Sequence, residues 1–271
     1  MGELSKFLPR QSIGVCAAYK KGRIVAAVAT VVLGDDDGLA LTFPKRNPFQ
    51  VGDGVTVHLD DRMGSEIYTI ELKVYRSSYK GLVSSVQGNR ATVSLEDFEL
   101  QYGGKVVARS RIPGFIHAPE LRPERPLPPS PLTKPIFADE NESSNKLGVL
   151  ITRGAGRPHS TVMAFLNTNL DDIFLITMSE SFKYQNLIRD PDCVFALDHR
   201  GNFNFEHQVD WNYTLYEAVA HRIDPSTRTF HQVQDEFVQK NPWEAAFFAS
   251  PSVKMIHLVP RRIIHQDILW D

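Results

Sequence analysis

Residues 173–191 read IFLITMSESFKYQNLIRDP. The apolar run predicts a strand that leads through a turn bearing Ser and Lys into a short helix. Thr177, Ser181 and Lys183 supply two hydroxyl groups and a cation, and the first-turn amides of the helix add unpaired N–H groups and the positive end of a dipole. A phosphate group fits this turn, although a Ser that caps a helix beside a Lys is also a common structural arrangement. A phosphorylated ligand is therefore the leading hypothesis.

The same stretch resembles the strand–turn–helix of the pyridoxamine 5′-phosphate oxidase-like flavoproteins, which carry FMN on a split β-barrel. Their pattern T-x-x-x-S-x-K-x-x-x-L-x-x-x-P is matched by Thr177, Ser181, Lys183, Leu187 and Pro191. The resemblance spans roughly residues 140–265 and implies that FMN is the cofactor. It also implies a homodimer with FMN sites at the subunit boundary.

A predicted hairpin precedes this stretch, with the sequence LGVLITRGAGRPHSTVMAF at residues 147–165. It reads as a strand, a Gly-rich turn and a second strand that starts near Arg157. In the family that it resembles, an Arg here and the strand after it meet the flavin. With the hydroxyls and the Lys above, the resemblance therefore implies a cofactor site of Arg157, His159, Ser160, Thr161, Met163, Thr177, Ser181, Lys183 and Asn186. For His159 alone, an ordinary barrel-rim histidine is the competing interpretation.

A proline-rich segment divides the chain. Seven of the 17 prolines fall between Pro119 and Pro135, a density that prevents regular helix or sheet and favours an extended connector. Such a segment also suits proline-reading modules, but a connector is the simpler interpretation. We expect a small N-terminal barrel domain at 1–118, a linker at 119–138 and a split-barrel flavin-binding domain at 139–271.

The N-terminal part reads as short strands separated by Gly, Asp and Asn turns, which predicts a small antiparallel β-barrel. Residues 51–76 are faintly similar to PilZ-like barrels, but the ligand motifs of that family are missing. The predicted strands are 25–33, 39–43, 54–59, 67–75, 81–86 and 90–95.

The C-terminal part adds strands at 193–197, 211–224 and 253–258, so the predicted fold class is mainly β with a few helices. Asp224 followed by Pro225 predicts a helix start, and the helix is expected to stop before Asn241. Pro260 is expected to end the last strand. The loop between His199 and His207 is expected either to form a substrate mouth or to be disordered.

Composition favours an ordinary globular protein. The chain has 271 residues with 42% hydrophobic content, a net charge of -2 and a pI near 6.5, and it has no long basic run, so we expect no nucleic-acid partner. The apolar patch at 24–33 is too short to cross a bilayer and no signal peptide is recognised, so we expect a cytoplasmic protein without a membrane partner. Cys16 and Cys193 are expected to be buried thiols. The histidines show no metal-ligand spacing, so no metal site is expected.

The sequence lacks the common motifs for nucleophilic catalysis, nucleoside triphosphates, dinucleotides and zinc proteases, which suits chemistry carried by a flavin. The first functional hypothesis is an FMN-dependent oxidoreductase that takes a small-molecule substrate or electron donor. Oxidation of pyridoxamine phosphate is doubtful, because the tail at 260–271 lacks the Arg-x-His pattern of those enzymes. The alternatives are a non-catalytic flavin carrier or sensor, and a haem-binding split-barrel protein with His159 as the first ligand to test.

Overall fold

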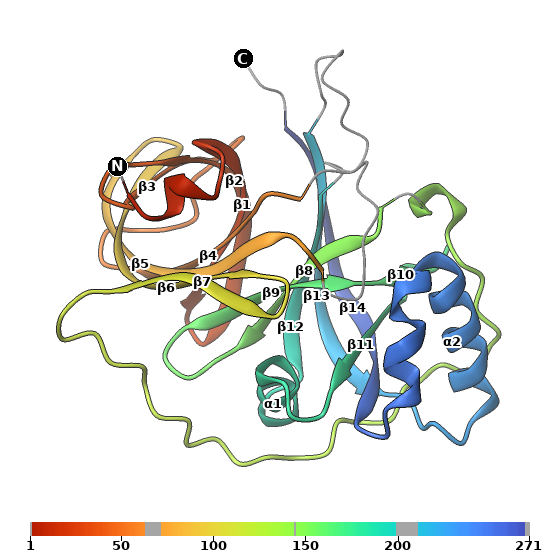
Figure 1. Ribbon diagram of the computed structural model, residues 1–271. Coiled ribbons are helices and arrows are strands. Elements are labelled where there is room, and N and C mark those ends of the chain that lie inside the picture. The colour runs from red at the N-terminus through yellow and green to blue at the C-terminus, as the bar shows by residue number, and fades with distance from the viewer. Residues whose placement is uncertain (1, 63–71, 144, 199–210, 269–271) are drawn as a thin grey trace.

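Two antiparallel sheets lie side by side and make up most of the molecule (Figure 1). The computed structural model describes residues 2–62, 72–143, 145–198 and 211–268. Strands dominate and the helices are short, which confirms the predicted fold class: mainly β, with a barrel in the N-terminal part and a curled sheet in the C-terminal part. The predicted loop between His199 and His207 lies outside the described residues.

The first sheet has the strand order β3-β2-β1-β4-β5-β6-β7, and an additional β3–β6 pairing closes six of its strands into a barrel, called here the first barrel. A 3-10 helix, η1 (Leu4–Lys6), precedes it. Its strands are β1 (Gln11–Lys20), β2 (Arg23–Leu33), β3 (Leu39–Thr42), β4 (Gly54–Asp60), β5 (Tyr75–Gln87), β6 (Arg90–Tyr102) and β7 (Lys105–Arg111).

The predicted strands at 25–33, 39–43 and 54–59 match β2, β3 and β4 within two residues. Two strands of the first sheet escaped prediction. Most of β1 is buried on both faces and so shows no alternation, whereas β7 is an exposed, largely polar edge strand. The predicted strand at 67–75 lies mostly outside the described residues, and its last residue begins β5.

The second sheet has the strand order β10-β11-β14-β13-β12-β8-β9. Its strands are β8 (Leu147–Arg153), β9 (Pro158–Ala164), β10 (Leu166–Asn167), β11 (Ile173–Met178), β12 (Asp192–Asp198), β13 (Trp211–Arg222) and β14 (Val253–Ile268). The helices of this half are η2 (Glu140–Glu142), α1 (Phe182–Arg189), α2 (Arg228–Lys240) and the 3-10 helix η4 (Pro242–Ala249).

Helix α2 begins three residues later than its sequence predicted. Thr227 is its N-cap and accepts from the N–H of Phe230, whereas the Asp224 carboxylate forms a local turn with the N–H of Ser226. Asp and Thr are both good capping residues, so the pattern Asp-Pro alone did not decide between them. The predicted stop is confirmed, because the helix ends at Lys240 with Asn241 as its C-cap.

The prediction that Pro260 ends the last strand is wrong. Strand β14 continues to Ile268, and the register of its pairing with β13 shifts between Glu217 and Ala218, opposite Pro260 and Arg262. A β-bulge tolerates a proline because the ladder hydrogen bonds are already interrupted there. The long β13–β14 pairing therefore survives the proline.

The proline-rich segment is the long extended connection that passes below α1 in Figure 1, and from Arg125 onward it is docked on the second half by hydrogen bonds. Arg222 donates from its N–H to the C=O of Pro128 at 2.8 Å, and its C=O accepts from the N–H of Ser130 at 2.8 Å. Leu127 is 3% exposed within the core of the second sheet. The division into two domains at residues 118 and 139 stays a prediction.

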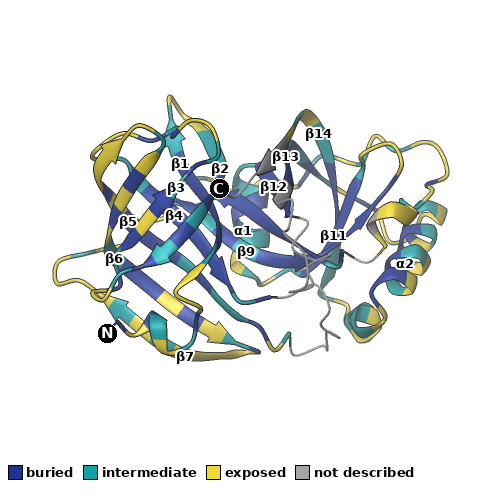
Figure 2. Cartoon of the chain, turned by 90° about the horizontal axis from the view of Figure 1, so that it is seen from above, coloured by how far each residue is buried: buried dark blue, intermediate teal, exposed yellow. Residues whose placement is uncertain are grey.

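A shared core joins the two halves. Ile13, Val15 and Val28 from the first barrel pack in one buried cluster with Ile151 and Leu215 from the second sheet. Dark-blue buried residues run through the strands of both halves in Figure 2, and α2 turns its exposed face outward. Cys16 and Cys193 are buried free thiols, as predicted. No helix in the described ranges is long and apolar enough to cross a membrane.

Candidate functional site

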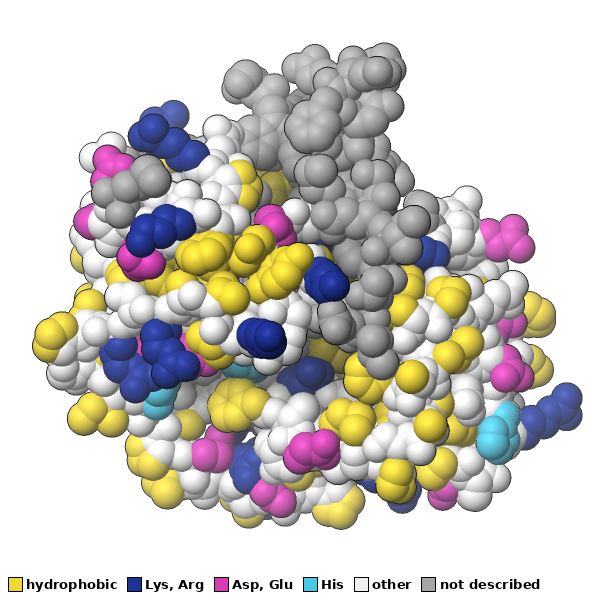
Figure 3. All heavy atoms as spheres, in the orientation of Figure 1, with side chains coloured by type: hydrophobic (Ala, Val, Ile, Leu, Met, Phe, Trp, Pro, Cys, Tyr) yellow, Lys and Arg dark blue, Asp and Glu magenta, His cyan; other side chains and the backbone are white. Residues whose placement is uncertain are grey.

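Two cavities lie where the first barrel meets β9 and the start of α1. Cavity 1 has a volume of about 810 Å³ and cavity 2 of about 850 Å³. They share the lining residues Arg76, Gln101, Thr161 and Lys183, so they adjoin one another. Several Lys and Arg side chains lie along the boundary between the two halves on the face in Figure 3. Both volumes lie in the range of small-molecule sites, roughly 300–1,000 Å³.

The predicted strand–turn–helix forms one wall of cavity 2. Strand β11 delivers Thr177, whose Oγ1 lies 2.8 Å from the Oγ of Ser181. Ser181 is the N-cap of α1 and accepts from the N–H of Tyr184 at 3.3 Å. The two hydroxyls therefore lie together at the lining of the cavity, beside the N-terminus of α1, where an anion is favoured.

Lys183 is half-buried and lines both cavities. Within the described part of the chain, its ammonium has no hydrogen bond and no ion pair. Burial lowers the pKa of Lys183, and the nearby positive charge of Arg76 lowers it further. A half-buried ammonium without an ion pair is stabilised when an anion enters the cavity and contacts it.

Glu244 of η4 also lines cavity 2. Burial raises the pKa of its carboxyl to about 7, an effect that the Trp243 hydrogen bond and the charge of Lys183 partly oppose. The indole Nε1 of Trp243 donates to the carboxyl at 3.0 Å. Near neutral pH this carboxyl therefore titrates, and its charge offsets that of Lys183 only in part.

Arg157 lines cavity 1, but its guanidinium is engaged by the first barrel. It donates to the C=O of Gly81 at 2.6 Å, forms an ion pair with Glu96 and lies 5.8 Å from the ring centre of Phe115. Gly54 makes room for it, since a Cβ at that position would lie 2.8 Å from the Arg157 Cζ. In this arrangement the guanidinium joins the two halves.

Strand β9 carries the other four residues that the sequence placed around the ring of the cofactor. His159 and Ser160 line cavity 1, Met163 lines cavity 2, and Thr161 lines both. Strand β9 is an edge strand, and the N–H of Ser160 points outward to the Oγ of Ser78 on β5. By the alternation of an antiparallel strand, the N–H of Val162 points to the same side, toward cavity 2.

The imidazole of His159 meets the ring of Phe182 edge-on, at 4.7 Å between ring centres. Among the described residues it has no hydrogen-bond partner. Burial lowers the pKa of His159 well below its ordinary value, and the nearby charges of Lys80 and Lys183 add to this effect. The ring is therefore neutral at pH 7 and offers one donor and one acceptor nitrogen.

Asn186 does not line either cavity. Its side chain is 1% exposed and its Nδ2 donates to the Oγ1 of Thr152 at 3.0 Å, which holds α1 against β8.

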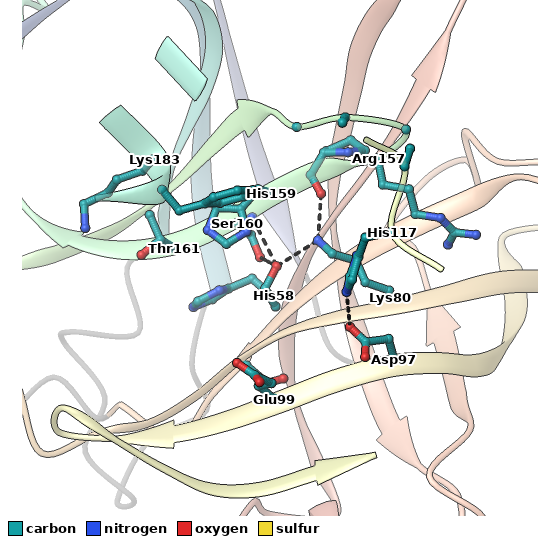
Figure 4. A pocket seen from close by; sticks show the side chains of 18 of the residues that line it. His58, Lys80, Asp97, Glu99, His117, Arg157, His159, Ser160, Thr161 and Lys183 are labelled. Carbon is teal, nitrogen blue, oxygen red and sulfur yellow. Dashed lines mark hydrogen bonds and ion pairs between the residues drawn. The ribbon is translucent and has the colours of Figure 1, made fainter. Parts of the chain in front are cut away.

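The sequence did not predict that residues of the first barrel line cavity 1. Arg76, Ser78 and Lys80 alternate on β5 and line cavity 1, whereas Tyr79 between them packs in the core of the first barrel. In Figure 4, Lys80 points from the barrel toward β9 and Ser160. Two cations four positions apart on one strand, which alternation places on the same face, were the signal that marked this face. Nothing local in the sequence indicated what the face would meet.

Lys80 is 8% exposed and donates to the C=O of Pro158 at 2.7 Å and to the hydroxyls of Thr56 and Ser78 at 3.0 Å each. All three acceptors are neutral. Burial lowers the pKa of Lys80 to about 7, and the charge of Arg157 contributes in the same direction. Its ammonium thus adds a positive charge to the wall of cavity 1 at neutral pH and below.

A buried ionic chain runs from cavity 1 across the boundary. Nε2 of His58, a lining residue, lies 3.2 Å from the Oδ2 of Asp60, which lies 3.2 Å from the Nε of Arg62. Arg62 then reaches the second sheet, where its Nη2 lies 2.6 Å from the Oδ2 of Asp198 and its Nη1 donates to the C=O of Leu147 at 2.7 Å. These groups hold the two walls together.

Comparison with known proteins gives likenesses of low identity. No family model and no curated protein matches the sequence. Solved structures that resemble the chain include a putative pyridoxamine 5′-phosphate oxidase from Listeria innocua (20% identity, TM-score 0.32, covering 45% of this chain and 88% of that one). An FAD-binding protein from Mycobacterium smegmatis is 15% identical, with a TM-score of 0.36, and covers 47% of this chain and 91% of that one.

The haem storage protein HutZ from Vibrio cholerae is 16% identical, with a TM-score of 0.39, and covers 46% of this chain and 89% of that one. The faint PilZ-like similarity of the first barrel gains no support from these comparisons.

Proposed function

We propose that this protein binds FMN in the two adjoining cavities and acts as an FMN-dependent oxidoreductase on a small-molecule substrate. One observation carries the proposal. The half-buried Lys183 forms no ion pair among the described residues, has only the partly protonated Glu244 carboxyl as an opposing charge, and stands beside two hydroxyls and a helix N-terminus in a cavity. This donor set fits a phosphate group, and the motif at 177–191 resembles that of FMN-binding split barrels.

The residues divide between the two ends of such a ligand. Lys183, Thr177 and Ser181 would hold the phosphate in cavity 2. The outward N–H of Val162 and the hydroxyl of Thr161 lie along the adjoining stretch of β9 and would offer hydrogen-bond partners to the polar groups of the flavin.

Bound FMN supplies the hydride and electron chemistry, and the chain supplies binding, orientation and control of solvent. The neutral imidazole of His159 lies in cavity 1, where it can donate a hydrogen bond to a substrate carbonyl or accept one from a hydroxyl. Phe182 packs against that imidazole and is 59% exposed at the same cavity, so it is placed to limit access of water.

A haem-binding protein is the second candidate, and His159 favours it. Ligation of haem iron by histidine requires a neutral imidazole with a free nitrogen, and His159 has both properties among the described residues. The visible spectrum separates the candidates, because a flavin gives two broad bands and haem gives a sharp Soret band. A Soret band in the wild type that is lost in His159→Ala would identify a haem ligand at His159 and would contradict the flavin proposal.

The decisive experiment is an FMN titration of the purified protein, followed by quenching of flavin fluorescence. We expect Lys183→Gln to raise the Kd for FMN about tenfold or more, because a charge-assisted hydrogen bond is lost. Lys134→Gln is the control, since Lys134 is exposed in the linker. Equal affinity in the two variants would contradict the assignment of the phosphate site. Turnover with NADH or NADPH and an electron acceptor then distinguishes an oxidoreductase from a non-catalytic flavin carrier.

A further inference from the structure

Strand β5 of the first barrel presents a second cation to the predicted phosphate site. Arg76 lines both cavities, and its charge is close enough to that of Lys183 to lower the pKa of that lysine. The guanidinium donates only to backbone carbonyls, those of Leu72 at 3.1 Å, Val74 at 3.3 Å and Gly103 at 2.7 Å. Among the described residues it forms no ion pair with a carboxylate; burial lowers the pKa of Arg76, and the negative charge of Asp60 opposes this effect from a longer distance.

Arg76 and Lys183, from different halves of the chain, thus border one cavity, and among the described residues neither forms an ion pair with a carboxylate. Like charges brought together away from water are costly unless an anion enters between them. Glu244 is the acidic side chain in the lining of cavity 2, and burial favours its protonated form. The charge pattern therefore calls for an anionic ligand group that both halves contact.

The first barrel is also fixed against the outer edge of β9, where a further strand or another chain would otherwise pair. Thr56 donates to the C=O of Pro158 at 2.6 Å, and Lys80 donates to the same oxygen at 2.7 Å. The Oγ of Ser78 accepts from the N–H of Ser160 at 3.3 Å. Side chains of the barrel thus satisfy the open edge of the sheet at the start of β9.

We propose that the first barrel completes the flavin site within a single chain, with Arg76 and Lys183 binding the phosphate together from the two halves. The inference rests on the proposed function. The sequence resemblance expects such a site at a boundary between two subunits, whereas both walls here come from one chain. The homodimer itself stays a prediction, but the site does not depend on it.

The first test is the Kd for FMN of Arg76→Met, measured by fluorescence quenching. We expect it to rise about tenfold or more, with a smaller rise in Arg76→Lys, which keeps the charge and loses the forked geometry. Arg90→Met is the matched control, because Arg90 is exposed on β6 and lines neither cavity. Thermal melts confirm that each variant is folded. A folded Arg76→Met with the wild-type Kd overturns the inference and leaves the proposed function intact.

The second test decides whether the two cations act within one chain. Arg76→Met and Lys183→Gln chains are co-expressed with different tags and purified together, and their FMN capacity is compared with that of each variant alone. A site within one chain gives no recovery, because every chain carries one lesion. Recovered high-affinity binding means that the site is shared between chains and overturns the inference. Wild-type protein that binds no FMN overturns the proposed function and this inference with it.

Discussion

Residues of the site could be predicted from the sequence where they lie close together along the chain. Thr177, Ser181 and Lys183 lie within seven residues of sequence, so the strand–turn–helix pattern alone brings them together. Arg76 and Lys80 lie about a hundred residues away from that turn, and no local rule indicates that β5 faces β9. For the same reason the engagement of Arg157 by the first barrel was not foreseen, since Gly81 and Glu96 are its partners.

Glu244→Gln tests the electrostatics of cavity 2 at the residue scale. The folded pKa of this carboxyl is raised from 4.5 to about 7. A raised pKa of an acid means that its contribution to stability is present below the unfolded pKa and is lost as pH rises through the folded pKa. Gln is neutral at every pH. We therefore expect the melting temperature of the variant minus that of the wild type to increase as pH rises from about 5 to 8. Melts at several pH values check this, and parallel curves would contradict it.

At the scale of elements, hydrophobic patterns located most strands but not where they end. Pro260 looked like a terminus because proline removes a ladder donor, yet the bulge opposite Ala218 absorbs it. The linker was expected from composition to be an extended connector, and it is extended. Its docking depends on Leu127 and on backbone hydrogen bonds to Arg222, which composition does not reveal.

Leu127→Ala tests whether the linker is part of the folded second half. The side chain is 3% exposed in a core that includes Leu150 and Phe195. We expect the free energy of unfolding to fall by about 2–5 kcal/mol, as for other buried leucines. Leu121→Ala in the same linker is the control, because Leu121 is 84% exposed and a surface change alters stability by roughly 0.5 kcal/mol at most. Similar unfolding free energies for the two variants in urea would mean that the linker is only a tether.

At the scale of the whole molecule, the two halves share a core and a buried ionic chain, and the cavities lie between them. Neither feature has a sequence signature, since each joins residues more than eighty positions apart, such as Arg62 with Asp198 and with Leu147. A site built at this boundary depends on the boundary for its geometry. Stability of the contact and affinity for the ligand are therefore coupled.

Arg62→Met tests this coupling. The guanidinium contacts Asp60, Asp198 and the C=O of Leu147, and its side chain is 4% exposed. Arg62→Met takes this buried guanidinium away from two buried carboxylates, so we expect a loss of about 3–5 kcal/mol in the free energy of unfolding, measured in urea. We also expect weaker FMN binding, because the two walls of the cavities lose a buried connection.

Two further variants serve as controls for this prediction. Arg261→Met removes the exposed ion pair with Asp192, whose side chains are 63% and 47% exposed, and is expected to cost at most about 1 kcal/mol. Arg62→Met combined with Asp198→Asn removes a buried charge together with its partner, so the pair should cost less than the sum of the single changes. If Arg62→Met unfolds like Arg261→Met and keeps the wild-type Kd for FMN, the boundary is held by the apolar cluster of Ile13, Val28 and Ile151 alone.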